Sequence, residues 1–425
     1  MEGWNCWSCL LDTGSLMNNP ITDLLAGFRY REMRVAKEWL LVPPPSNPHV
    51  AVIGDYDCDG ICSSAIIIRT LETIGWRVTE HVARRASGYG SGSSLFDEVM
   101  QSDPSVVVVC DMGTNDFEGV KRFVDYGKRV VIIDHHLPDS LCTIHKVPHH
   151  MVSLINPLTD NKSGHSKEKL VGLCSSGLAR ILSEYLVGTE GGRLCEEDEF
   201  ASFIRQIACI GTVGDMADIT NEINATIIAE GIEAIKNAAH PAVSTMISSS
   251  FDKNKTIDYR FLAFNVCPVI NAPGKIYDDA YSSLAMFIKL DKGFCVECAK
   301  YCIRCNNWRK GESERCARKA EVNMVKFADG TGIIYGEFPI GLVGSIANRL
   351  LKFNLDRCIC VTTATYDSVL KGSARGENVL EYLEGFRDSL VRLGGHKNAC
   401  GFTIERIRLQ NLYDYVRMKD IQVKE

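Results

Sequence analysis

Short runs of β-branched residues alternate with longer helical patterns through the first half of the chain. Apolar runs at 50–54 (VAVIG), 106–110 (VVVVC) and 130–133 (VVII) have the length and composition of buried strands. Between these runs, apolar positions recur at helical spacing, first over residues 63–74. This alternation is typical of repeated βαβ units. It predicts an α/β fold with a parallel sheet that is covered by helices.

The remaining pattern divides the chain into further segments. A proline triplet at 43–45 ends a first helical segment, because a helix cannot continue through consecutive prolines. Helical patterns cover about 170–235 and about 281–323, and glycine-rich turns at 328–341 open a second α/β segment. We predict four parts: an N-terminal helical arm at 1–47, a catalytic α/β domain at 48–235, a helical connector at 236–325 and a smaller α/β domain at 326–425.

Acidic and histidine side chains follow the predicted strands. The first strand runs into the turn DYDCDG, the second into an aspartate and the third into an Asp-His-His triplet, and a later loop has the sequence GTVGDMAD. The side chains concerned are Asp55, Asp57, Asp59, Asp111, Asp134, His135, His136 and Asp215. Ligands of open α/β sheets bind beyond the carboxyl ends of the strands, so we expect these residues to share one site.

This set of residues favours divalent metal ions. The DYDCDG turn alone is also compatible with a solvated acidic turn or an isolated calcium loop, but four separate elements supply Asp or His here. Carboxylates with one or two imidazoles suit Mn²⁺, Mg²⁺ or Co²⁺ better than a thiolate-rich structural zinc site. Six carboxylates exceed the charge of one divalent ion, so we predict two ions. Such pairs, roughly 3.5–4 Å apart, activate a hydroxide and clamp a phosphate.

Composition and charge limit the partners. The 425 residues include 47 basic and 53 acidic side chains, and a net charge of −6 argues against a general DNA coat but allows a local basic groove. No apolar run is long enough to span a bilayer, and the first residues lack the features of a secretory signal. We therefore expect no membrane association, a cytoplasmic location and reduced thiols at the 18 cysteines.

The motifs resemble those of the DHH/DHHA1 phosphoesterases, a family named for the triplet found here at 134–136. DYDCDG at 55–60, CDMG at 110–113 and GTVGDMAD at 211–218 are similar to its first, second and fourth motifs. GGHKNACG at 394–401 resembles the GGHxxAxG signature of its smaller domain. Within the family the chain resembles the RecJ exonucleases. Further similar segments are an arginine followed by GYG (84 and 88–90), INP (155–157), PVINAPGK (268–275), GLVGSIANRL (341–350) and GSARG (372–376).

The resemblance implies a role for each matching residue. It implies that the metal ligands are Asp55, Asp57, Asp59, Asp111, His135 and Asp215. Asp134 would orient the His135 ring, and His136 would face the scissile phosphate, so that Asp111, Asp134 and His136 form the catalytic group. Substrate would lie in a cleft between the two lobes. The substrate-binding residues would be Arg84, Arg349, Ser373, Arg375, Gly394, Gly395 and His396.

The activity implied by the resemblance is metal-dependent hydrolysis of single-stranded DNA, rather than RNA, from the 5′ end to nucleoside monophosphates. It further implies Mn²⁺ as the cofactor and a role in DNA repair or recombination. Only 24 residues follow Gly401, where such nucleases usually carry an oligonucleotide-binding barrel, so we expect weaker binding or a protein partner that supplies the grip. The alternatives are a phosphodiesterase for short oligonucleotides or cyclic dinucleotides, a partner-dependent nuclease and a catalytically inactive scaffold. The intact Asp and His positions argue against the scaffold.

Two further patterns admit more than one interpretation. Cys295, Cys298, Cys302 and Cys305 could bind zinc or an iron–sulfur cluster, but their spacing places them on one face of a helix and favours a buried core stripe. The basic residues between 304 and 319 are interpreted as a solvated helix face rather than a strand-binding channel. Arg349 and Arg375 could likewise be ordinary surface charges.

Overall fold

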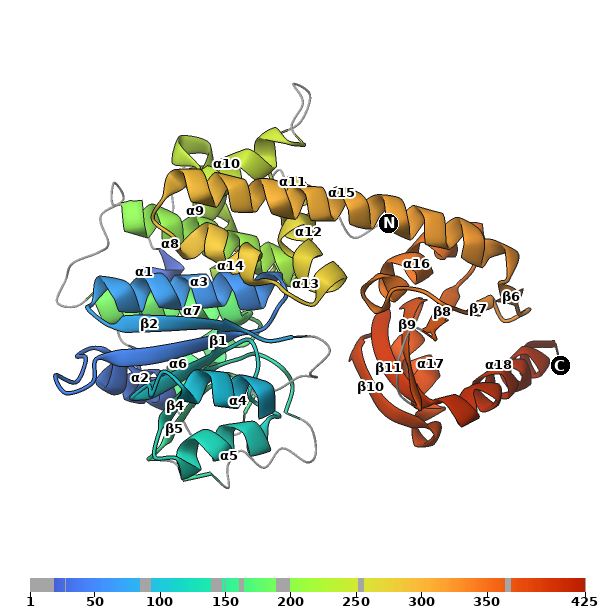
Figure 1. The fold of residues 1–425 in the computed structure, drawn as a ribbon, viewed down its shortest axis with the longest axis horizontal. Helices are drawn as coiled ribbons and strands as arrows, with labels where there is room; N and C mark the ends of the chain where they lie inside the picture. Colours follow the sequence, from blue (N-terminus) through green and yellow to red (C-terminus); the bar gives the residue numbers. More distant parts are fainter. Residues whose placement is uncertain are drawn as a thin grey trace. The chain divides into compact units, whose positions relative to one another are not determined.

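The chain forms two units, Met1–Ile303 and Arg304–Glu425, and the boundary between them falls within helix α15 (Lys292–Val322) (Figure 1). The computed structural model describes residues 19–26, 28–84, 93–138, 147–148, 150–159, 164–188, 199–250, 256–363 and 368–424. A parallel sheet with helices in the first unit and a second sheet in the other confirm the predicted α/β class. The finer division into four parts and the position of the substrate stay predictions.

Five parallel strands form the sheet of the first unit, in the order β2-β1-β3-β4-β5. Their bounds are β1 His49–Gly54, β2 Arg77–Val82, β3 Val106–Cys110, β4 Arg129–Ile133 and β5 Val152–Ile155. The strands β1, β3 and β4 match the three predicted runs and are almost wholly buried. The sequence pattern did not predict β2 and β5, because β2 alternates polar residues into a mostly half-buried strand and β5 is only four residues long.

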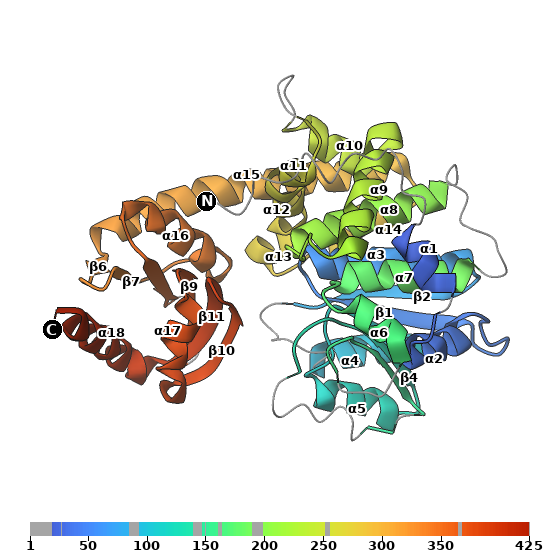
Figure 2. The ribbon, with the colours of Figure 1, turned by 180° about the vertical axis from the view of Figure 1, so that it is seen from behind.

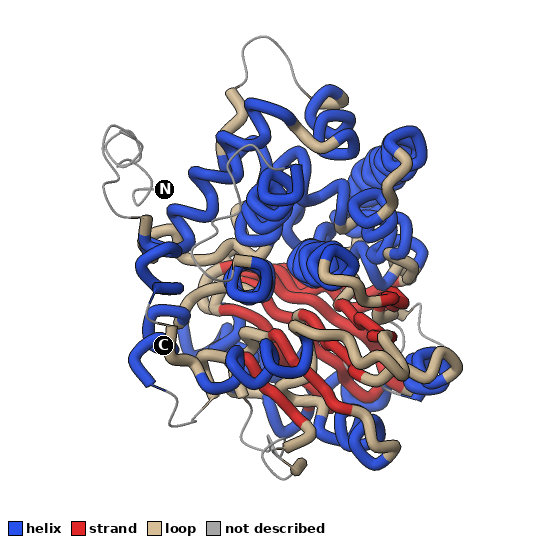
Figure 3. Tube along the Cα trace, turned by 90° about the vertical axis from the view of Figure 1, so that its left-hand side faces the viewer, coloured by secondary structure: helices blue, strands red, loops and turns tan. Residues whose placement is uncertain are grey.

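Helices cover both faces of this sheet (Figure 3). Val52 and Val108 point into a core formed with α3, α7 and α8, whereas Ile53 and Val109 point into a smaller core formed with α4 and α5. The helices of the unit are α1 Pro20–Ala26, α2 Arg31–Leu40, α3 Cys58–Thr73, α4 Ser93–Met100, α5 Phe117–Asp125, α6 Gly164–Leu170, α7 Ser175–Val187, α8 Glu199–Gly214, α9 Glu222–Ala238, α10 Pro241–Ser248, α11 Tyr259–Phe261, the π-helix η4 Leu262–Val266, α12 Cys267–Ile270, α13 Ala272–Tyr277 and α14 Tyr281–Ile288.

The helix α3 begins five residues earlier than the predicted start at residue 63. The Asp57 side chain accepts hydrogen bonds from the backbone N–H groups of Asp59 (3.0 Å) and Gly60 (3.1 Å) and so caps the helix. Gly60 fits here because a Cβ atom would lie 2.6 Å from the Asp55 carbonyl oxygen. The DYDCDG segment is therefore a helix N-terminus rather than a free turn, which fixes its carboxylates in place.

The second unit is built on a six-stranded sheet in the order β10-β11-β9-β8-β7-β6. The helix α16 and the end of α15 pack on one face, and α17 and α18 pack on the other (Figure 2). The elements are β6 Val325–Lys326, β7 Thr331–Gly336, η5 Ile340–Leu342, α16 Val343–Leu350, η6 Leu351–Phe353, β8 Arg357–Thr362, β9 Val369–Gly376, α17 Val379–Glu384, η7 Arg387–Ser389, β10 Leu390–His396, β11 Ala399–Glu405, η8 Arg406–Arg408 and α18 Leu409–Lys424.

The cysteine stripe of α15 is structural. Cys295, Cys302 and Cys305 are at most 3% exposed, and Cys298 is half-buried. The Cys295 Sγ donates a hydrogen bond to the Lys289 carbonyl oxygen at 3.1 Å. Within the described ranges, no group of side chains positioned to hold a metal ion includes these cysteines. The core interpretation is confirmed. Of the helices described, none is both long enough and apolar enough to cross a lipid bilayer.

Candidate metal centre

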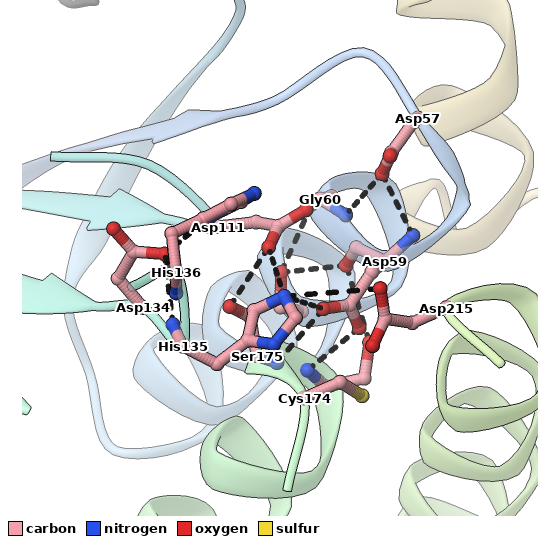
Figure 4. A network of polar contacts seen from close by, with 12 residues as sticks. Asp57, Asp59, Gly60, Asp111, Asp134, His135, His136, Cys174, Ser175 and Asp215 are labelled. Atoms are coloured by element: carbon pink, nitrogen blue, oxygen red, sulfur yellow. Dashed lines mark hydrogen bonds and ion pairs between the residues drawn. The ribbon is translucent and has the colours of Figure 1, made fainter. Parts of the chain in front are cut away.

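The pairing of the strands brings the predicted carboxylates together at one edge of the sheet. Gly54 of β1 lies opposite Cys110 of β3, and Cys110 lies opposite Ile133 of β4. The next residue of each strand is Asp55, Asp111 or Asp134, so three carboxylates leave the sheet in one row. Figure 4 shows Asp59, Asp111 and Asp215 around His135, with Asp134 beside His136. This confirms the expectation that the strand ends converge.

Asp59 is held by the N-terminus of α7. Its two carboxylate oxygens accept hydrogen bonds from the backbone N–H groups of Ser175 (2.8 Å) and Ser176 (2.9 Å). The Ser175 hydroxyl also donates to Asp111 Oδ1 at 3.0 Å. The positive end of a helix stabilises negative charge, so α7 anchors two buried carboxylates of the site. The motif interpretation did not find these two serines, because nothing in their spacing links them to Asp59.

The His135 ring lies among three carboxylates. Its Nε2 is 3.3 Å from Asp111 Oδ1 and 3.8 Å from both Asp59 Oδ2 and Asp215 Oδ1. Asp215 follows the C-terminus of α8, and its N–H donates to the Gly211 carbonyl oxygen at 2.9 Å. Burial lowers the pKa of His135, which favours the neutral ring that ligates metals.

Three groups of side chains could each hold a cation. They are Asp59 with His135 and Asp215, Asp55 with Asp57 and Asp111, and Asp111 with His135 and His136, each with its potential ligand atoms within 4.8 Å of one another. The groups overlap at Asp111 and His135. An arrangement of two adjacent ions therefore fits these residues as well as a single ion does.

Asp134 organises the loop that carries the two histidines. Asp134 Oδ1 accepts hydrogen bonds from the N–H of His135 (2.8 Å), the N–H of His136 (3.2 Å) and the His136 Nδ1 (2.8 Å). The Thr114 N–H donates to Oδ2 at 2.9 Å. The ring that Asp134 orients is thus that of His136, not that of His135 as the resemblance implied. The reason is that Asp134 accepts a hydrogen bond from the backbone N–H of His135 but from the side-chain Nδ1 of His136.

Asn156 completes this network from the INP segment. Its Nδ2 donates to the Thr114 hydroxyl and to the His136 carbonyl oxygen, both at 2.9 Å. Burial alone would raise the pKa of Asp134, but the hydrogen bonds from His136 and Thr114 outweigh burial and hold that pKa below its usual value. Burial opposes protonation of His136, but the hydrogen bond to Asp134 outweighs it and raises the pKa of His136 to about 9.

The other carboxylates repel one another. Burial and the charge of Asp57 raise the pKa of Asp55 to about 8, and burial with the charges of Asp59 and Asp57 raises the pKa of Asp215 to about 8. Burial and the neighbouring carboxylates also raise the pKa of Asp111 well above its usual value. Oxygen-rich clusters of this kind bind hard divalent cations, which remove the repulsion. The donor set therefore fits divalent metal ions.

A second polar cluster lies in the other unit, around the start of α16. Arg309 of α15 donates to the Ser345 hydroxyl at 3.3 Å, and burial and the nearby Arg349 charge lower its pKa. On β9, the Arg375 Nη1 donates to the Ser373 hydroxyl at 2.7 Å. A Cβ atom on Gly344 would lie 2.6 Å from the Arg375 Nη2, so glycine leaves room for this guanidinium. Three guanidinium groups and two hydroxyls are suited to bind an anion such as phosphate.

The chain is similar to known proteins over most of its length. The model of the DHH family, N-terminal domain, matches residues 49–212. A single-stranded-DNA-specific exonuclease RecJ of Bacillus subtilis is 24% identical over 391 residues, which cover 90% of this chain and 47% of that protein. The RecJ of Thermus thermophilus is 26% identical over 360 residues, or 84% of this chain and 49% of that protein. The chain thus spans about half the length of these two curated relatives.

A solved structure shows the same fold. The crystal structure of RecJ from Thermus thermophilus in complex with Mn²⁺ superposes on this chain with a TM-score of 0.73 at 21% identity. The superposition covers 92% of this chain and 55% of the RecJ chain. Residues 49–212 match the DHH family, N-terminal domain, and the chain shares its fold with RecJ. The RecJ-like fold extends over both units, because the superposition covers nearly all of the chain.

The remaining predicted site residues lie in the second unit or at the edge of the first. Arg84 is exposed, two residues after β2, and the GYG at 88–90 lies outside the described residues. In the second unit, Gly394 and Gly395 pair with Gly401 and Cys400 of β11. Gly395 has φ +144°, a conformation that requires glycine. The His396 side chain lies outside the described part of the structure.

The sequence interpretation missed Arg309. Arg309 belongs to the basic residues that were interpreted as a solvated face, and that interpretation fits Arg315 and Arg318, which pair with Glu312 and Glu314. Arg309 instead is half-buried and contacts Asn306 and Ser345. Only its tertiary contact with α16 distinguishes it from its neighbours.

Proposed function

We propose that this protein is a divalent-metal-dependent exonuclease that hydrolyses single-stranded DNA from the 5′ end and releases nucleoside monophosphates. The observation that carries the proposal is the convergence of Asp59, Asp111, His135 and Asp215 from four separate elements. Their potential ligand atoms belong to overlapping groups that could hold metal ions. The RecJ-like fold and the DHH domain support the choice of a phosphodiester substrate.

In this proposal, Asp55, Asp57, Asp59, Asp111, His135 and Asp215 hold two divalent ions, with Mn²⁺ favoured because Mn²⁺ is bound in a RecJ of the same fold. Bound divalent ions supply a hydroxide nucleophile at neutral pH and offset the charge of the phosphate. Asp57 is fixed as the cap of α3 and Asp59 by the N-terminus of α7, so the ligands are positioned before any ion binds.

His136 acts on the phosphate in this proposal. Its Nδ1 is held by Asp134, which leaves Nε2 for the substrate, and its side chain is 49% exposed while Asp134 is buried. Nε2 would donate a proton to the 3′-oxygen that leaves the phosphorus. Asp134, Thr114 and Asn156 are positioning residues, because they touch the histidine loop rather than the reacting atoms.

The arginine cluster of the second unit binds the phosphates of the DNA strand in this proposal. We assign Arg349, Ser373 and Arg375 to it, as the resemblance implies, and we add Arg309 and Ser345 from the structure. Guanidinium groups hold phosphate oxygens in a bidentate manner and do not depend on base identity. A role in DNA repair or recombination follows from the same likeness.

The test is a cleavage assay with Mn²⁺ on single-stranded DNA 30-mers labelled at the 5′ or the 3′ end. We expect early release of the 5′ label as mononucleotide and stepwise shortening of the 3′-labelled strand. The Asp111→Asn variant keeps the side-chain shape and should lose this activity. Cleavage that starts at the 3′ end, or a strong preference for a dinucleotide over the 30-mer, would overturn the proposal. Equal activity of the variant would also overturn it.

A further inference from the structure

The residue after Asp215 has an unusual backbone conformation. At the end of α8, the Met216 N–H donates to the Val213 carbonyl oxygen and the Ala217 N–H donates to the Thr212 carbonyl oxygen, both at 3.2 Å. This pattern closes a helix with a left-handed residue, a position that glycine usually fills. Met216 has φ +59°. In the described ranges, six non-glycine residues have positive φ; five are Asp or Asn, which tolerate this conformation, and Met216 is the sixth.

The fold does not account for a methionine here. The Met216 side chain is 83% exposed, so the residue adds little to the core. Glycine would close the helix with less strain, and a polar side chain would suit the exposure better. Met216 directly follows Asp215, a carboxylate of the site. Because consecutive Cα atoms are about 3.8 Å apart, the backbone of Met216 lies at the edge of the site.

A second exposed apolar residue adjoins the site from another element. Leu137 follows His136 and is 77% exposed. Its carbonyl oxygen accepts a hydrogen bond from the Asn115 Nδ2 at 3.0 Å, which holds the backbone while the side chain stays in solvent. Apolar side chains thus follow both Asp215 and His136, although the centre itself is made of charged and polar groups.

We infer that Met216 contacts a nucleobase next to the scissile phosphate. This inference rests on the proposed function, since it assigns part of the substrate to the same site. A phosphate at the metal centre brings its flanking nucleotides to the site edge. A thioether packs well on an aromatic face, and this contact does not depend on base identity. The strain at Met216 is then retained because the side chain serves the substrate.

The experiment compares wild-type protein with Met216→Gly and Met216→Leu on two DNA substrates. One is a normal single-stranded 10-mer, and the other carries tetrahydrofuran residues, which lack bases, at the first two positions from the 5′ end. We measure kcat/KM with Mn²⁺ and, separately, Kd for the same strands with Ca²⁺ in place of Mn²⁺. Val42→Gly is the matched control, because Val42 is 72% exposed and precedes β1, at the opposite end of that strand from Asp55.

We expect Met216→Gly to fold with a Tm equal to or above that of wild type. On the normal strand, its kcat/KM or affinity should fall by about 2- to 12-fold, the range for a sulfur–aromatic contact. On the abasic strand, Met216→Gly should equal wild type. On the normal strand, Met216→Leu should keep most of the wild-type kcat/KM and affinity. Met216→Gly losses that are equal on both strands, or absent from both, would overturn the inference.

The two measurements separate this inference from the proposed function. Wild-type protein that binds DNA without cleaving it would refute the exonuclease, yet base-dependent loss of affinity in Met216→Gly would still support the contact. Wild-type protein that neither binds nor cleaves either strand would overturn both proposals.

Discussion

Replacing Asp215 by asparagine should stabilise the metal-free protein at pH 8 and weaken its response to divalent metal. Asp215 lies 3.8 Å from the His135 ring, its side chain is 24% exposed, and burial with the charges of Asp59 and Asp57 raises its pKa to about 8. Asparagine has nearly the same shape but cannot ionise, so it removes the repulsion and also removes a charged ligand.

The direction of the pH dependence follows from that pKa. The folded protein keeps the Asp215 proton up to about pH 8, whereas the unfolded chain loses it near pH 4. Between these values the folded state binds more protons, so the free energy of unfolding of the metal-free protein falls as pH rises from 4 to 8. A rise in pKa from 3.8 to about 8 corresponds to ~5–6 kcal/mol as an upper limit, which solvent screening reduces.

The assay is urea denaturation of EDTA-treated protein at pH 6 and pH 8, repeated with Mn²⁺. Without metal, Asp215→Asn should be more stable than wild type at pH 8, by a smaller margin at pH 6, and it should gain less from Mn²⁺. Asp218→Asn is the control, since Asp218 lies in the same loop but is exposed and accepts hydrogen bonds from Thr220. A metal-free Asp215→Asn protein that is less stable than wild type at pH 8 would refute the reasoning.

Three further predictions test other parts of the structure. Asp134→Asn should lower kcat by roughly 10- to 100-fold with little change in Mn²⁺ stoichiometry, because Asp134 orients His136; an unchanged kcat would exclude that role. Arg309→Gln should raise KM for single-stranded DNA about tenfold at constant kcat, which is the effect of one lost charged hydrogen bond. An unchanged KM would mean that Arg309 is part of the solvated helix face after all. Burial lowers the pKa of His240 to about 4, so stability should fall as pH drops from 6.5 to 4, and His240→Asn, which keeps a capping side chain, should reduce that loss; identical urea midpoints for both proteins at pH 4.5 would contradict this.

The parts of the fold that the sequence predicted share one physical origin. Residues 106–110 and 130–133 lie in strands that are buried on both faces, so their side chains form continuous apolar runs. Parallel pairing then carries Asp55, Asp111 and Asp134 to the same edge without any further information. The metal-binding character of the site was therefore predictable from strand ends alone.

The other features of the fold and the site depend on tertiary contacts, which local sequence patterns do not reveal. Asp and Gly disfavour helix interiors, so DYDCDG predicts a turn, yet the Asp57 cap allows α3 to start there. Ser175 and Asp59 meet across 116 positions of sequence, and no spacing rule links them. Cys58 lies among acidic residues, but its thiol is buried against Cys267 and Cys62. Contact with Cys267 lowers its pKa, but the contact with Cys62 and burial outweigh this and raise that pKa well above its usual value.

In the proposed function, the Asp–His cluster of the first unit holds the divalent ions needed to hydrolyse the phosphodiester bond. The most direct measurement is anomalous scattering at the manganese edge from crystals grown with Mn²⁺. We expect two peaks, roughly 3.5–4 Å apart, in contact with Asp59, Asp111, His135 and Asp215, and loss of at least one peak in Asp111→Asn. Peaks elsewhere on the chain, or no peak at these residues in active protein, would contradict the proposed function.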